Sequence, residues 1–191
     1  GFKGIGGILG HDTFYGFFKE AGKSQLVSGG RYRPLSLILF AIEWQLFGRS
    51  PGSGHALNLL LYGLLCLMVY LAMERLLAPT VQPRIRYPAA WITAILFAAH
   101  PVHTEAVANI KGMDEILALL GCLFALYLAF KQIPGHRNVL FAGLVFLLGM
   151  LAKENAITWV VVVPLAYLLL GNQRLMNSIR FSWPWLAAAA L

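Results

Sequence analysis

Apolar runs without a single charged residue alternate with short polar segments along the chain. The charge-free runs cover residues 55–73, 87–99, 116–130, 138–152 and 157–170, and another apolar segment begins at Trp183. A helix needs about 20 apolar residues to cross the roughly 30 Å hydrocarbon core of a membrane. The first run reaches that length by itself, and the run from Ile116 needs an extension back to Met113. We therefore predict an all-α bundle with about five to six transmembrane helices.

Residues 1–54 are the least apolar part of the chain and contain no run long enough to span a membrane. The segment from Leu35 to Phe47 has about 13 residues, roughly 20 Å as a helix, so we expect an interfacial or re-entrant helix there. This pattern predicts two regions. Residues 1–54 form an outer-face loop with short interfacial helices, and residues 55–191 form a transmembrane bundle. Because the chain lacks an initiator Met and stops in an apolar segment, we expect it to be the middle of a longer protein.

Composition supports a polytopic membrane protein. Hydrophobic residues make up 59% of the 191 residues and charged residues only 12%, whereas soluble domains carry about 25% charged residues. The net charge is +7, but the basic residues are scattered among the loops. We interpret them as topology signals and contacts to anionic lipid or phosphate, and we predict no nucleic-acid partner.

Polar residues concentrate in two segments that follow apolar runs. The first runs from His100 to Glu115 and holds two histidines, three carboxylates and a lysine; the second is Leu151-Ala-Lys-Glu-Asn-Ala156. Pro101 predicts a helix break at His100. If a helix starts at Lys111, that lysine shares one face with the carboxylates three and four residues later.

The distribution of basic residues predicts which membrane face these segments occupy. Loops 74–86, 131–137 and 172–180 hold seven lysines and arginines against one acid, so we predict that they are cytoplasmic. The opposite face then receives the other seven acids, including both polar segments. We expect an integral protein of a bacterial inner membrane, or of the endoplasmic reticulum membrane in a eukaryote, with its site on the periplasmic or lumenal face.

Several of these polar residues have two interpretations. His100, His103 and Glu105 could hold a divalent metal or bind phosphate, or they could cap helix ends at the interface. Arg31 and Arg33 flank Tyr32 in a glycine-rich segment, an arrangement suited to phosphate oxygens or to anionic headgroups.

Two further sites carry the same ambiguity. Lys153 and Glu154 either neutralise each other as a structural pair, or Lys153 binds phosphate. Asp12 is either a helix cap or a general base.

Three blocks together resemble a known family. These are His100-Pro-Val-His-Thr-Glu-Ala-Val-Ala-Asn-Ile-Lys-Gly-Met-Asp-Glu115, with Tyr32-Arg-Pro-Leu-Ser36 before it and Leu151-Ala-Lys-Glu-Asn-Ala-Ile-Thr158 after it. In their order and spacing they resemble the transmembrane and tetratricopeptide-repeat O-mannosyltransferase-like proteins. The resemblance covers roughly residues 11 to 170. It implies a GT-C glycosyltransferase that takes a mannose-like sugar from a polyprenyl-phosphate lipid and gives it to a protein or glycan acceptor.

The resemblance also implies roles for the polar residues. The acid of the first outer loop, which serves as base or orients the acceptor, matches Asp12; many relatives have a second acid next to it, where this chain has Thr13. The donor phosphate would then be bound by Arg31, Arg33, His100, His103, Lys111 and Lys153, supported by Glu105, Asp114, Glu115 and Glu154. We expect metal-independent catalysis; if a divalent cation is used, His100, His103 and Glu105 would hold it.

Two other functions fit parts of the sequence. A transporter would place ionisable residues near the middle of the bilayer, whereas here they gather at one face. A non-catalytic membrane scaffold that presents a tetratricopeptide-repeat domain is the alternative, and the single acid at Asp12 favours it slightly.

Overall fold

The computed structural model describes residues 2–11, 32–130, 136–170 and 183–189. Every element in these ranges is helical, which confirms the all-α prediction. The elements are η1 (Phe2–Gly4), α1 (Ile5–Gly10), α4 (Pro34–Phe47), α5 (Pro51–Leu77), α6 (Pro83–Ala99), η2 (Pro101–His103), α7 (Thr104–Ala108), η3 (Ile110–Gly112), α8 (Met113–Ala129), α9 (His136–Ala152), η4 (Glu154–Thr158), α10 (Trp159–Leu169) and α12 (Trp183–Ala189).

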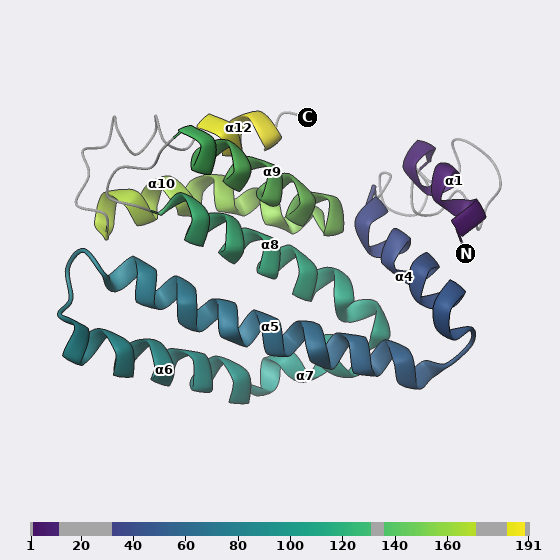
Figure 1. Ribbon diagram of the computed structural model, residues 1–191, viewed down its shortest axis with the longest axis horizontal. Coiled ribbons are helices and arrows are strands. Elements are labelled where there is room, and N and C mark those ends of the chain that lie inside the picture. Colours follow the sequence, from purple (N-terminus) through teal and green to yellow (C-terminus); the bar gives the residue numbers. More distant parts are fainter. Residues whose placement is uncertain (1, 12–31, 131–135, 171–182, 190–191) are drawn as a thin grey trace.

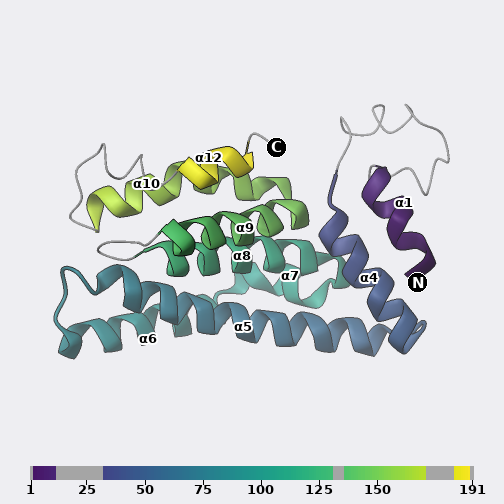
Figure 2. The ribbon, with the colours of Figure 1, turned by 45° about the horizontal axis from the view of Figure 1, so that its top comes forward.

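The long helices lie side by side in layers. In both views α5 and α6 form an antiparallel hairpin on one side, α8 lies in the middle, and α9, α10 and α12 lie on the other side (Figures 1 and 2). Helix α8 packs against both α5 and α9, and α12 packs against α9. The short helix α4 lies across one end of this stack, next to the beginning of α8.

Two stretches in the described residues are long and apolar enough to cross a membrane. They are Pro51–Leu77, with a mean hydropathy of 2.1, and Ile110–Ala129, with a mean hydropathy of 1.7. In the apolar 18-residue part of each stretch, only 22% of the first and 44% of the second is buried inside the molecule. An apolar helix left so uncovered is suited to contact with lipid rather than to the core of a soluble protein. Helices α4, α6, α9 and α10 are shorter, so the count of five to six spans stays a prediction.

Small residues let α8 and α9 approach closely. The core between them consists largely of alanines with Cys122 and Phe146, all buried. A Cβ added at Gly121 would lie 2.9 Å from the Cα of Gly149. Such contact between backbones is the usual way in which helices pack inside membranes, where small residues replace large apolar ones at the interface.

The two ends of α8 are held by different chemistry. At its C-terminal end, Arg75 Nε donates to the carbonyl oxygen of Phe130 at 2.9 Å, and the Tyr167 hydroxyl donates to the carbonyl of Ala129. These bonds satisfy carbonyls that have no partner within the helix. At its N-terminal end α8 meets a cluster of charged side chains. This charged cluster lies beside α4 and η4.

The predicted break at Pro101 is confirmed. Helix α6 ends at Ala99, and His100 has an extended backbone with φ −73° and ψ 127°. The chain then makes three short helical turns before α8 begins at Met113. The helix predicted over residues 35–47 is also confirmed as α4, while its place at a membrane surface stays a prediction. Most of the basic loop residues 131–137 and all of 172–180 lie outside the described residues.

Candidate functional site

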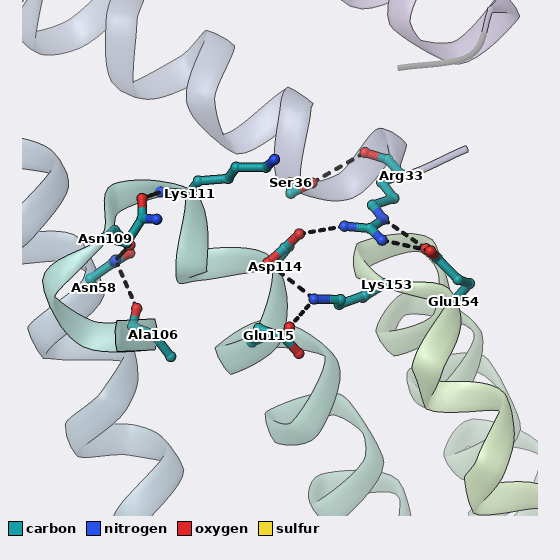
Figure 3. A network of polar contacts seen from close by, with 10 residues as sticks. All are labelled: Arg33, Ser36, Asn58, Ala106, Asn109, Lys111, Asp114, Glu115, Lys153 and Glu154. Atoms are coloured by element: carbon teal, nitrogen blue, oxygen red, sulfur yellow. Dashed lines mark hydrogen bonds and ion pairs between the residues drawn. The ribbon is translucent and has the colours of Figure 1, made fainter. Parts of the chain in front are cut away.

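A cavity of about 860 Å³ opens at the N-terminal end of α8. Its charged wall is drawn in Figure 3, where the side chain of Arg33, just before α4, and side chains from α8 and from the segment around η4 point toward one another. The described residues that line it include seven charged ones: Arg33, Glu105, Lys111, Asp114, Glu115, Lys153 and Glu154. His103 and Trp159 also contribute to the lining. The two polar segments of the sequence, residues 100–115 and 151–156, thus form one site.

Arg33 lies immediately before α4 and connects two other segments. Its Nε and Nη2 donate to the two carboxylate oxygens of Glu154 at 2.6 and 2.5 Å, and its Nη1 donates to Asp114 Oδ2 at 2.7 Å. The Arg33 side chain is only 10% exposed. The hydrogen bond to Glu154, followed by the negative charges of Glu154 and Asp114, raises the pKa of Arg33 against the opposing effect of burial. The guanidinium is therefore a fixed cation that holds α4, α8 and η4 together.

Asp114 lies at the centre of this network. One of its oxygens accepts from Arg33, and the other lies 4.0 Å from Lys153 Nζ. Lys153 Nζ also donates to Glu115. The Asp114 side chain is 8% exposed, whereas those of Glu115 and Glu154 are 51% and 54% exposed. A buried carboxylate between two cations keeps its charge balanced, and the two outer glutamates complete the pairing.

Lys111 occupies a different position from its neighbours. It lies in η3, and α8 begins only at Met113, so the condition for sharing a helical face with Asp114 and Glu115 is not met. The Lys111 side chain is exposed and lines the cavity. Its backbone N–H donates to Asn109 Oδ1 at 3.1 Å, which fixes the turn that carries it.

The turn between α7 and α8 is shaped by two residues that the sequence analysis did not single out. Asn58 of α5 is fully buried, and its Nδ2 donates to the carbonyl of Asn109 at 2.8 Å. A Cβ at Gly112 would lie 2.2 Å from the carbonyl oxygen of Ala106, so only glycine fits there. A signal was present for Asn58, because an amide inside a charge-free membrane run needs a hydrogen-bond partner.

The two histidines, His100 and His103, have different surroundings in the structure. His103 lines the cavity and packs on Phe97, with ring centroids 4.2 Å apart. Burial, and then the nearby His100, lower the pKa of His103, so its ring is neutral at pH 7. His100 is exposed, and its Nδ1 accepts from the backbone N–H of Val102 at 3.2 Å. Within the described ranges no group of three His, Cys, Asp or Glu side chains is arranged to hold a metal ion.

The structure thus brings together most of the residues singled out in the sequence. Eight of them line one cavity: Arg33, His103, Glu105, Lys111, Asp114, Glu115, Lys153 and Glu154. His100 lies beside it, outside the lining residues. Asp12 and Arg31 fall outside the described residues.

Comparisons with known proteins identify the family of this chain. Residues 33–191 match the family described as dolichyl-phosphate-mannose-protein mannosyltransferase. Protein O-mannosyl-transferase TMTC1 of Homo sapiens is 32% identical over 154 residues, which are 74% of this chain and 17% of that protein. Protein O-mannosyl-transferase TMTC4 of Mus musculus is 33% identical over 173 residues, 80% of this chain and 22% of that protein.

A third relative is protein O-mannosyl-transferase Tmtc3 of Drosophila melanogaster, 32% identical over 150 residues, 66% of this chain and 16% of that protein. The chain spans less than a quarter of the length of these curated relatives. No solved structure matches it. The matched range begins at Arg33 and includes all the described cavity-lining residues. The chain therefore belongs to the dolichyl-phosphate-mannose-protein mannosyltransferase family and is a relative of the TMTC protein O-mannosyl-transferases.

Proposed function

We propose that this chain is part of a membrane glycosyltransferase that moves a mannose-like sugar from a polyprenyl-phosphate lipid to a hydroxyl of a protein or glycan acceptor. The observation that supports this most is the charged cavity at one end of a bundle whose long helices are apolar. Such a cavity can take a polar sugar phosphate while the lipid tail stays beside the apolar helices. The names of the relatives support the type of reaction, and the donor lipid is our proposal.

The proposed transfer breaks the bond between the anomeric carbon and the phosphate oxygen. The acceptor oxygen attacks that carbon, a carboxylate base takes the hydroxyl proton, and the prenyl phosphate leaves with the electron pair. Cations that face the departing phosphate lower the energy of the charge that develops on it. We assign the base to Asp12, and phosphate binding to Lys111, Arg33 and Lys153 in the cavity, with Arg31 as a further candidate.

His103 has a separate proposed role. Because its ring is neutral at pH 7 and lines the cavity, it can donate one hydrogen bond and accept another without adding charge. It would orient a polar group of the donor or acceptor. His100 would support it from outside the cavity. We place this site on the periplasmic or lumenal face, because the basic loops 74–86, 131–137 and 172–180 follow the opposite ends of the helices.

The test uses the full-length protein in membranes, given polyprenyl-phosphate sugars and peptide or glycan acceptors. We expect sugar transfer by the wild type and its loss in Asp12→Asn and His103→Ala. Glu74→Gln is a matched control. Glu74 pairs with Arg86 at 3.0 Å and is not among the residues that line the cavity, so this change should not affect transfer. Absence of transfer from every donor, with folded protein, would instead support the non-catalytic scaffold.

A further inference from the structure

The two cations at the centre of the cavity wall already have carboxylate partners. Glu154 occupies two N–H groups of the Arg33 guanidinium, and Glu115 occupies the Lys153 ammonium. The geometry at Arg33 is the paired, parallel arrangement that a guanidinium forms equally well with a carboxylate or with a phosphate. A phosphate that enters the cavity must therefore compete with these two glutamates.

The three carboxylates of the network are not equivalent. Asp114 is 8% exposed and contacts both cations from inside the bundle. Glu115 and Glu154 are half exposed, and both line the cavity. A half-exposed carboxylate can return to water at little cost, whereas a buried one cannot leave its partners without a large desolvation penalty. Asp114 is thus suited to hold the cations, and the two glutamates are suited to leave.

We propose that Arg33 and Lys153 form a phosphate site and that Asp114 holds both cations in position. Glu154 and Glu115 occupy this site until the phosphate of a prenyl-phosphate lipid replaces them. Release of Glu154 frees Arg33 Nε and Nη2 for two phosphate oxygens, while Nη1 stays on Asp114. Release of Glu115 frees Lys153 for a third oxygen. The exchange leaves both cations with an anionic partner, because the phosphate takes the place of the two glutamates. The lipid identity rests on the proposed function, whereas the exchange itself does not.

The exchange predicts that removing a competing carboxylate strengthens phosphate binding. If a pair is closed in about nine of ten molecules, the apparent affinity of the site is reduced about tenfold. We therefore expect Glu154→Gln to bind a short-chain prenyl phosphate about tenfold more tightly than the wild type, and Glu115→Gln to show a smaller gain. Asp114→Asn should bind it more weakly, because the cations lose the residue that positions them.

The measurement is calorimetric titration of the full-length protein in detergent with a short-chain prenyl phosphate and, separately, with inorganic phosphate. Glu105→Gln is the matched control: Glu105 lines the same cavity, and no ion pair with it is found in the described part of the chain. This variant removes the same charge without releasing Arg33 or Lys153. We expect it to change the affinity much less than Glu154→Gln.

Each result decides between explanations. If Glu105→Gln and Glu154→Gln gain the same phosphate affinity, the gain comes only from the changed electrostatic potential of the cavity, and the exchange is overturned. Unchanged or weaker phosphate binding in both Glu154→Gln and Glu115→Gln would also overturn it. If inorganic phosphate gains as much as the lipid, the exchange stands but its ligand is free phosphate. Binding requires no sugar transfer, so an inactive protein with the expected affinities would overturn only the proposed function.

Discussion

Gly121 of α8 and Gly149 of α9 lie in direct backbone contact, so that a Cβ on Gly121 would stand 2.9 Å from the Cα of Gly149. Nothing flexible at this crossing can move aside. We predict that Gly121→Ala lowers the free energy of unfolding by about 1–3 kcal/mol, the usual cost of overpacking a filled interface. Thermal unfolding in detergent would measure it. Gly63→Ala is the control, since a Cβ there meets nothing within 4 Å, and equal effects of the two changes would contradict the prediction.

Asn58 should be essential to the turn that carries Asn109 and Lys111. Its replacement by Ala leaves the Asn109 carbonyl without the 2.8 Å hydrogen bond that it accepts from α5. We expect a loss of about 1–3 kcal/mol in stability, as for other buried polar groups that lose their partner. Hydrogen exchange of residues 104–112 should rise in Asn58→Ala. The exposed neighbour Leu59, changed to Ala, should leave exchange in this turn as it is.

The protonation of His103 should depend mainly on its burial. Its pKa lies below the ordinary value of 6.5, so the unfolded chain binds this proton more tightly than the folded chain does. The stability contributed by the neutral ring is therefore fully present above pH 6.5 and is lost as the pH falls through the lower folded pKa. We expect NMR titration to give a His103 midpoint below 6.5.

His100→Ala separates the two causes of this shift. Removing the nearby imidazole should move the His103 midpoint upward, but burial is the larger cause and should keep it below 6.5. A midpoint at or above 6.5 in the wild type would show that the ring is solvated.

Arg33 should support the fold as well as the site. In Arg33→Ala the buried carboxylate of Asp114 loses its 2.7 Å partner, and we expect a cost on the order of 3 kcal/mol. Arg33→Lys should recover only part of it, because an ammonium cannot replace the planar fork that reaches both Asp114 and Glu154.

A double-mutant cycle checks the source of this cost. If the loss comes from the unpaired carboxylate, Asp114→Asn in the Arg33→Ala background should restore part of the stability. Strict additivity of the two changes, measured by thermal unfolding, would argue against coupling between these residues.

The local pattern of the sequence was sufficient for much of the fold. Charge-free apolar runs predicted the helices, Pro101 predicted the break after α6, and the loop charges predicted that the polar segments share one end of the bundle. These features depend on residues within one or two turns of each other, where helix propensity, proline geometry and hydropathy act directly. The three motif blocks also indicated the family before the geometry was known.

The partners within the site were decided by the tertiary structure. Arg33 and Glu154 are 121 positions apart, and no local pattern indicates that one guanidinium joins this glutamate to Asp114. The same holds for Asn58, which reaches a turn 51 positions away, and for the glycines at the crossing of α8 and α9.

Lys111 shows that local spacing alone was not sufficient. Its spacing to Asp114 and Glu115 fits one helical face, but the helix begins two residues later. Sequence alone thus determined which residues are polar and at which end of the helices they lie. Their pairing depends on how the helices pack, because a charge inside the bundle takes whichever partner packing brings within hydrogen-bond distance.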